Sequence, residues 1–124
     1  MRERTRYRRS MADLTDHLQV LTTVDDRDAA LDLAREVVAQ RLVACAQVVG
    51  PITSVYRWQG AVEQANEWFC VMKTTGARYE ALAAWIAEHH PYDTPEVVAT
   101  PIVGGSRDYL EWISHETGDH GVTH

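Results

Sequence analysis

The chain has 124 residues, of which 45% are hydrophobic and 24% charged, and this size supports one compact domain with one core. Twelve basic and eighteen acidic residues give a net charge of −6; residues 1–10 carry +4, so the remainder carries −10. An acidic body of this kind argues against nucleic acids as partners. No apolar run approaches the roughly 20 residues of a membrane-spanning helix, so we expect a cytoplasmic protein with no membrane contact.

The chain divides into three parts by composition. Residues 1–16 are rich in arginine and lack apolar periodicity, which predicts a disordered basic arm; an arm that touches phosphate or membrane is the alternative. Residues 17–118 carry the periodic patterns of a single domain, and residues 119–124 predict a frayed polar tail.

The domain begins with a predicted strand followed by a helix. Apolar residues recur with strand-like alternation from His17 to Val24, and the carboxylates of Asp25 and Asp26 are suited to cap the helix that follows. The apolar face of that helix recurs at i, i+4, i+7 and i+8 and comprises Ala30, Ala34, Val37 and Val38.

A long hairpin follows. Residues 42–58 are rich in β-branched residues and are interrupted at Gly50 and Pro51, which predicts a long strand with a bulge. Gln59 and Gly60 provide a two-residue turn, and residues 61–74 return as the antiparallel partner.

The last third of the chain predicts a helix, a strand and a further helix. Residues 76–90 have helical periodicity that Pro91 ends, and residues 96–103 form the last strand. Ser106 is suited to cap a short helix, and Gly118 to stop it. The residues on the apolar side of this helix are Tyr109, Trp112 and Ile113.

This order of elements predicts an α+β fold, a ferredoxin-like βαββαβ sandwich with an extra C-terminal helix. Two helices cover one face of such a sheet, yet residues 43–46 and 68–72 are apolar at both alternating positions. Strands of this composition need cover on both faces, and the second strand is far longer than usual. The sequence therefore predicts an oligomer of this chain.

The densest cluster of polar and aromatic residues is HHPYDTPE, residues 89–96. His89 and His90 are adjacent on a helix and point about 100° apart, so the pair does not chelate one ion as an i, i+4 pair would. One imidazole with a carboxylate such as Glu96 provides a candidate metal site; alternatively, both histidines close the helix, where its dipole favours a cation.

The base of the hairpin carries a second set of candidates. Lys73 lies on a strand that is otherwise apolar, so it is either a snorkelling edge residue or a charge paired with a carboxylate or an anionic ligand. An anion pocket here would be lined by Tyr56, Arg57, Trp58, Glu67, Lys73 and Tyr92.

Common catalytic motifs are missing from the sequence. There is no GxGxxG, GxxxxGK[ST], HExxH or GxSxG, and Cys45 has no base at a fixed spacing, so we expect neither an enzyme nor an organic cofactor. Cys45 and Cys70 are not opposite in the simple hairpin register, which disfavours a disulfide and favours inert thiols in a reducing compartment. The Gly-Gly-Ser at 104–106 is interpreted as a turn before a helix, not as an anion site.

Three segments in this order, RLVACA at 41–46, GPITSVYRWQG at 50–60 and HHPYDTPE at 89–96, resemble the CutA divalent-cation-tolerance family. The resemblance covers about residues 17–114. It implies a fold related to that of PII signalling proteins, assembled as a tight trimer in which the hairpins of neighbouring subunits join, and a cytoplasmic protein linked to copper and other divalent cations.

The resemblance also implies a metal site, of which this chain has only some of the ligands. In some bacterial members, the proposed copper site combines the paired histidines with a cysteine at the end of the first strand, where this chain has Thr22. Because a hydroxyl replaces the soft thiolate, this position counts against a high-affinity Cu(I) site and leaves Cu(II) or Zn(II) on imidazole as open alternatives.

Three functions remain open on the sequence. The first is a homotrimer that binds a divalent metal, copper before zinc, through His89, His90 and Glu96. The second is a PII-like signalling module that holds a small anionic ligand between subunits, and the third is a trimeric scaffold without a ligand.

Overall fold

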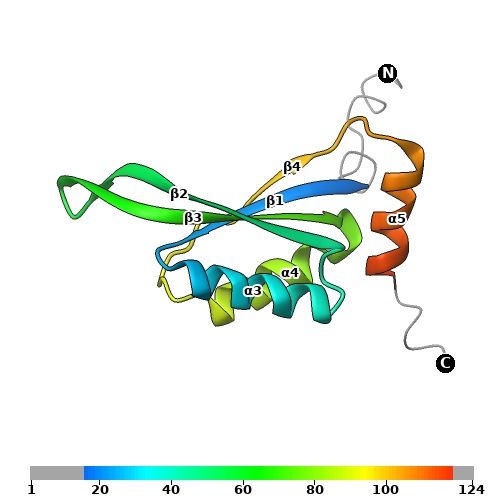
Figure 1. Ribbon diagram of the computed structural model, residues 1–124, viewed down its shortest axis with the longest axis horizontal. Coiled ribbons are helices and arrows are strands. Elements are labelled where there is room, and N and C mark those ends of the chain that lie inside the picture. Colours follow the sequence, from blue (N-terminus) through cyan, green and yellow to red (C-terminus); the bar gives the residue numbers. More distant parts are fainter. Residues whose placement is uncertain (1–15, 119–124) are drawn as a thin grey trace, which may run out of the picture.

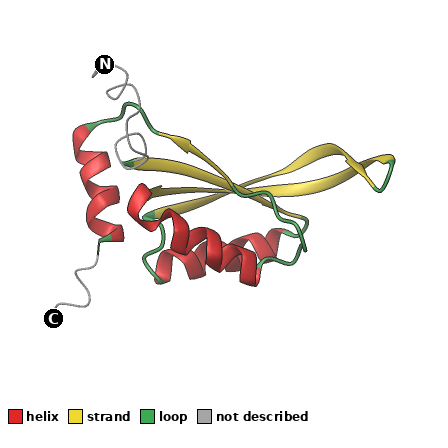
Figure 2. Cartoon of the chain, turned by 180° about the vertical axis from the view of Figure 1, so that it is seen from behind, coloured by secondary structure: helices red, strands yellow, loops and turns green. Residues whose placement is uncertain are grey.

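The computed structural model describes residues 16–118 and confirms the predicted ferredoxin-like α+β fold. One antiparallel sheet contains four strands in the order β2-β3-β1-β4. Helices α3 and α4 lie side by side on one face, and α5 stands at the end of the sheet away from the hairpin tip (Figures 1 and 2). The elements are β1 (His17–Val24), α3 (Arg27–Ala39), β2 (Cys45–Trp58), β3 (Ala61–Thr75), α4 (Gly76–His89), β4 (Val98–Pro101) and α5 (Arg107–Thr117).

The two predicted end segments lie almost entirely outside the described residues. Apart from Asp16, the predicted basic arm lies outside the described residues, and so does the predicted tail at 119–124. Within the described part, the helices are too short or too polar to cross a membrane.

Local signals place the helices as the sequence predicts. The Asp26 carboxylate accepts a hydrogen bond from the backbone N–H of Ala29 at 2.9 Å, and the Ser106 hydroxyl accepts one from the N–H of Tyr109 at 3.3 Å. The inner face of α3 differs by one residue, because Leu33 is buried while Val38 is 39% exposed.

The core lies between the sheet and the two helices α3 and α4. Alternate residues of the central strands point to this side, and Val20, Cys70 and Met72 have no exposed surface. Leu82 and Ile86 of α4 meet them, also with no exposure. The remaining core residues are Leu18, Leu33, Ala34, Val37, Leu42 and Val43.

The β2–β3 hairpin forms as predicted, with its turn and its bulge. Gln59 and Gly60 both have positive φ, 50° and 84°, as a two-residue turn between twisted strands requires. The pairing shifts by one residue between Val49 and Ile52, on either side of Gly50 and Pro51. A β-carbon on Gly50 would lie 2.6 Å from Cδ1 of Trp68, so the close approach of this ring requires glycine.

Two strands are shorter than predicted. β2 begins at Cys45, because residues 42–44 form a buried connection in which the N–H groups of Leu42 and Val43 bond to the Val37 carbonyl. The last strand spans only Val98–Pro101, where 96–103 was predicted. Buried loops and strands have the same apolar composition, so hydrophobicity alone does not separate them.

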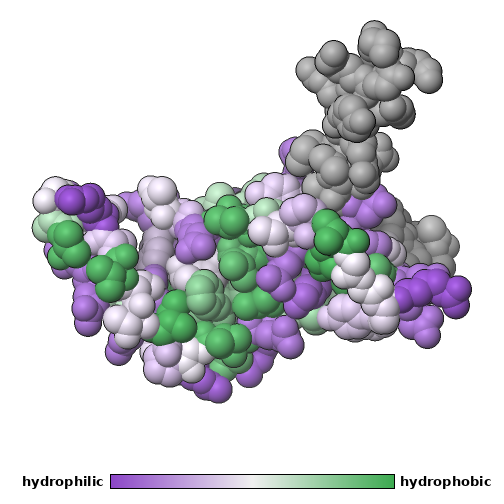
Figure 3. All heavy atoms as spheres, turned by 90° about the horizontal axis from the view of Figure 1, so that it is seen from above, coloured by the Kyte–Doolittle hydropathy of each residue, from purple (hydrophilic) through white to green (hydrophobic). Residues whose placement is uncertain are grey.

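The face of the sheet opposite the helices has no cover within the described chain. Figure 3 looks onto this side, and hydrophobic side chains gather over its centre. Cross-strand pairing places Leu21 beside Val71 and Val98, and Val49 beside Phe69. We call these five residues the open-face patch; Val49 and Val98 are 50% and 46% exposed, and the other three are partly buried.

Candidate functional site

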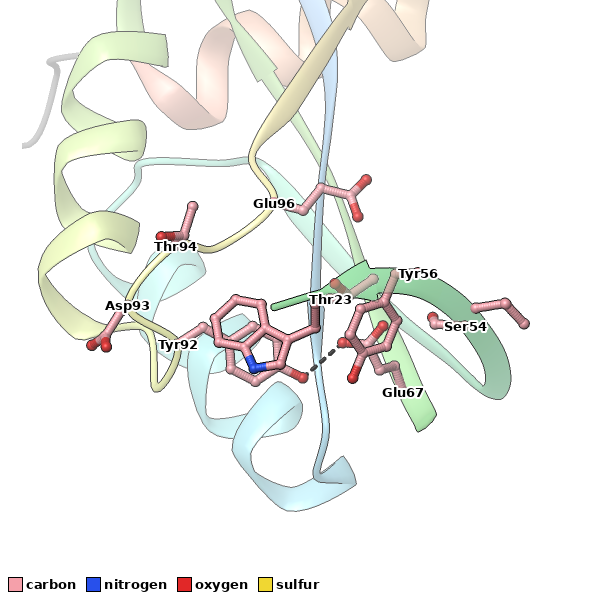
Figure 4. Close-up of a pocket in the computed structure, with 10 residues that line it drawn as sticks. Thr23, Ser54, Tyr56, Glu67, Tyr92, Asp93, Thr94 and Glu96 are labelled. Carbon is pink, nitrogen blue, oxygen red and sulfur yellow. Dashed lines mark hydrogen bonds between the residues drawn. The ribbon is translucent and has the colours of Figure 1, made fainter. Parts of the chain in front are cut away.

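A cavity of about 650 Å³ lies between the hairpin and the loop that joins α4 to β4. Figure 4 shows side chains of the loop, including Tyr92 and Asp93, on one side, and those of the hairpin, including Tyr56 and Glu67, on the other. Segments about 30 residues apart in the sequence therefore form the site together. The lining residues are Thr23, Ser54, Val55, Tyr56, Trp58, Glu67, Tyr92, Asp93, Thr94 and Glu96.

The imidazole of His90 fixes the loop beside this cavity. Its Nε2 lies 2.9 Å from the Thr23 carbonyl, which can only accept, and its Nδ1 lies 3.0 Å from the backbone N–H of Tyr92, which can only donate. These partners define a neutral ring protonated at Nε2. Burial lowers the pKa of His90, although the Thr23 hydrogen bond and the charges of Asp25 and Glu67 act in the opposite direction.

A hydrogen bond across the cavity joins the loop to β3. The Tyr92 hydroxyl donates to Oε2 of Glu67 at 2.7 Å (Figure 4). Burial raises the pKa of Tyr92, as does its hydrogen bond to Glu67, so the phenol keeps its proton and remains a donor. Glu67 is only 9% exposed, which makes it the innermost acidic group of the site.

The charge of the cavity wall is negative. Glu67, Asp93 and Glu96 contribute three carboxyl groups, and the wall contains neither lysine nor arginine. The ion pairs found within residues 16–118 involve none of these three carboxylates. The site therefore favours a positively charged occupant over an anion.

Of the six residues predicted for an anion pocket, Tyr56, Trp58, Glu67 and Tyr92 line this cavity, while the two cations do not. Arg57 falls between Tyr56 and Trp58, and successive side chains of a strand point to opposite faces. Lys73 is six residues from Glu67 along β3, roughly 20 Å in an extended strand, and its Nζ donates to Gln47 at 3.4 Å. Within one chain these two cations therefore lie outside this cavity, and the anion pocket between subunits stays a prediction.

The three predicted metal ligands do not converge. His90 uses both ring nitrogens in hydrogen bonds, whereas His89 is exposed, stacks on Trp85 with ring centroids 4.2 Å apart, and donates from Nδ1 to the Trp85 carbonyl. Glu96 lies on the cavity wall. Across residues 16–118 no three His, Cys, Asp or Glu side chains lie close enough to hold a metal ion. The three side chains therefore do not fit a metal within one chain, and of the two histidines only His89 has a ring nitrogen, Nε2, available for one.

Comparisons with known proteins agree with this architecture. The sequence profile described as CutA1 divalent ion tolerance protein matches residues 18–116. The chain belongs to the CutA1 divalent-ion-tolerance family. A protein of Escherichia coli O45:K1 named divalent-cation tolerance protein CutA is 41% identical over 100 residues, which is 81% of this chain and 89% of that protein.

Solved structures of CutA1 proteins share the fold. The protein from Oryza sativa superposes with a TM-score of 0.82 and 36% identity, covering 86% of this chain and 97% of its own. The protein from Thermus thermophilus gives a TM-score of 0.80 and 40% identity, covering 82% of this chain and 99% of its own. The family match includes all the cavity residues, since they lie between positions 23 and 96.

Thr22 occupies the position where some CutA members carry a cysteine, and here it belongs to the core. It has no exposed surface, and its hydroxyl has no hydrogen-bond partner among the described residues. The two cysteines are free thiols in the described structure, because β3 places Cys45 opposite Lys73 and Cys70 opposite Val48. Burial raises the pKa of Cys70 to about 12, which keeps its thiol protonated and unreactive.

Several cavity residues were not singled out from the sequence. Ser54 alternates with Tyr56 and Trp58, so strand periodicity carried a signal for it. Asp93 and Thr94 lie inside the polar cluster at 89–96, in which His89, His90 and Glu96 were the predicted metal ligands. Thr23 and Val55 had no local signal, because only the packing of the loop against the sheet brings them to the cavity.

Proposed function

We propose that this CutA-family chain acts in divalent-cation tolerance as a cytoplasmic homotrimer that binds a divalent metal ion, with copper the first candidate and zinc the second. The observation that carries the proposal is the uncovered apolar face of the sheet, continuous with a hairpin that extends beyond it (Figure 1). Contiguous exposed apolar surface of this kind is typical of interaction sites between proteins.

The hairpin supports assembly for a second reason. β1 pairs with β3 only over residues 68–75, so the far half of the hairpin is a ribbon of two strands with open hydrogen-bonding edges. A two-stranded ribbon is marginally stable alone, and its exposed residues include Val55, Trp58 and Val62. Pairing with the sheets of two other copies would satisfy these edges, and a closed ring of subunits would leave none of the apolar faces open.

Metal binding rests on family membership and on His89. Because its Nδ1 donates to a backbone carbonyl, Nε2 presents a lone pair to solvent, an arrangement common among metal-ligating histidines. The described residues of one chain supply no second and third ligand beside it. The remaining ligands would come from other subunits or from water, so the ion is a loosely held cargo and no structural cofactor. The chain thus binds the metal ion and carries out no catalytic step on it.

Native mass spectrometry of the untagged protein, purified without chelator, tests both parts of the proposal. We expect a trimer that carries copper-sized or zinc-sized increments. His89→Ala should lose the metal and keep the trimer, whereas His115→Ala, which removes another exposed imidazole, should keep both. Metal retained in His89→Ala at the wild-type level would remove the assignment, and a trimer that takes up no added copper or zinc would favour the scaffold function.

The open-face patch is tested by Val71→Asp. A carboxylate at the centre of a subunit interface is buried without a partner, so we expect a folded monomer by native mass spectrometry. Ala81→Asp adds the same charge at an exposed position of α4, on the helix side of the sheet, and serves as the control. A Val71→Asp protein that stays trimeric would contradict the use of this face.

A further inference from the structure

We propose that the cavity between the hairpin and the 90–96 loop binds an organic cation, a molecule with an ammonium, amidinium or guanidinium group on a small apolar body. The positive group pairs with Glu67, and the apolar body lies against the aromatic side chains of the wall. This site is separate from His89, so its test does not depend on metal binding.

The first observation is the buried carboxylate of Glu67. The residue is 9% exposed, its Oε2 accepts from Tyr92, and no donor among the described residues reaches its Oε1. Oε1 is not among the buried polar atoms without a partner, so it is reachable from the cavity. A cationic donor in the cavity would therefore give Glu67 both a counter-charge and a second hydrogen bond.

The second observation is the composition of the wall around Glu67. Tyr56, Trp58 and Tyr92 are aromatic, and Val55 adds an apolar surface. Aromatic faces attract ammonium and guanidinium groups, and they also pack against an apolar body. Asp93 and Glu96 also line the cavity and add negative charge to its wall.

The size of the cavity and the chemistry of its wall fit an organic cation better than a bare metal ion. The cavity volume of about 650 Å³ falls in the range of small-molecule sites. A divalent metal ion requires several converging ligands, and no such group exists among residues 16–118. Aromatic walls contribute nothing to the coordination of such an ion but stabilise an organic cation.

Isothermal titration calorimetry with benzamidine and benzamide tests the inference. The two probes have nearly the same shape, but only benzamidine carries a positive charge and a bidentate donor for a carboxylate. We expect benzamidine to bind at one site per chain and benzamide to bind at least about tenfold more weakly. Absence of benzamidine binding, or equal binding of the two probes, would overturn the proposal.

Two variants locate the site. Glu67→Gln keeps the size of the side chain and removes its charge, so it should weaken benzamidine binding about tenfold or more. The control is Glu80→Gln, which changes the net charge equally at an exposed position of α4 and should leave binding unchanged. If Glu67→Gln is unfolded by circular dichroism, Trp58→Ala at the exposed rim replaces it and should also weaken binding. Wild-type affinity in folded Glu67→Gln would overturn the assignment.

The cation has two possible sources, a free molecule or a basic side chain of a second copy. Native mass spectra recorded with and without benzamidine distinguish them. An unchanged number of subunits supports a free organic cation. A decrease on addition of benzamidine supports the same chemistry with a lysine or arginine of another copy as the occupant.

Discussion

Both faces of the sheet carry apolar residues at the centre, and the two faces differ in their surroundings. On the helix side, Val20 and Met72 have no exposed surface, whereas on the opposite side Leu21 and Val71, the neighbours of these residues in sequence, are only partly buried. Strand alternation assigns residues to a face, but the two helices cover only one. The comparison shows that apolar residues of one sheet can form the core of their own chain on one face and be available to a second chain on the other.

The largest effect is expected from truncation on the covered face. Met72→Ala removes a fully buried side chain and leaves a cavity between the sheet and α4, so we expect the free energy of unfolding to fall by about 3 kcal/mol. Urea denaturation at a protein concentration low enough to give monomers measures this loss.

Val71→Ala is the matched variant on the open face. Its side chain is only partly buried, so in the monomer the loss should be less than half of that for Met72→Ala. If the free energy of unfolding falls equally in the two variants, the open face is covered by its own chain and the two faces do not differ.

The same contrast between a covered and an open side chain recurs in the adjacent histidines. His90→Ala leaves the Thr23 carbonyl and the Tyr92 N–H without partners in a buried region, and it should lower the free energy of unfolding by about 2 kcal/mol. His89→Ala loses an exposed hydrogen bond and a stacking contact, so its loss should be below about 1 kcal/mol by thermal and urea denaturation. If His89→Ala lowers the free energy of unfolding more than His90→Ala does, then His89 and not His90 is the structural histidine.

The burial of His90 also predicts a pH dependence. Its pKa is lowered in the folded state from the ordinary value of 6.5, so below that pH the unfolded chain binds a proton that the folded chain does not. The stability is complete above about pH 6.5 and is lost as the pH falls toward the folded pKa. Urea denaturation from about pH 7.5 to pH 5 should show this loss in the wild type and a smaller loss in His90→Gln. Parallel profiles would contradict the burial of a neutral ring.

A gain in stability is expected at Thr22, a polar residue on the covered face. Its hydroxyl is fully buried and has no hydrogen-bond partner among the described residues, so Thr22→Val, which keeps the shape, should raise the free energy of unfolding by about 1 kcal/mol. A lower melting temperature in Thr22→Val would show that the hydroxyl has a partner in solution.

Much of the architecture was predictable because its signals are local. The Asp26 cap, the Gln59-Gly60 turn and the bulge at Gly50 each depend on a few adjacent residues, and all three form where predicted. The start of β2 was wrong, because a buried connection and a buried strand have the same apolar composition. The length of β4 was also wrong, because the β-branched residues Ile102 and Val103 continue the strand-like pattern beyond Pro101, where the pairing with β1 ends.

The sequence by itself determined the order of the elements, the hairpin and the membership of a family, because periodicity, turn residues and linked motifs all lie within short stretches of the chain. Only the tertiary structure decided the site. It turned His90 inward and left His89 outward, separated Lys73 and Arg57 from the cavity, and placed three carboxyl groups with three aromatic rings around one space. The physical reason is that charge and shape at a site depend on residues distant in sequence, whose positions are set by the packing of the loop and the hairpin against the sheet.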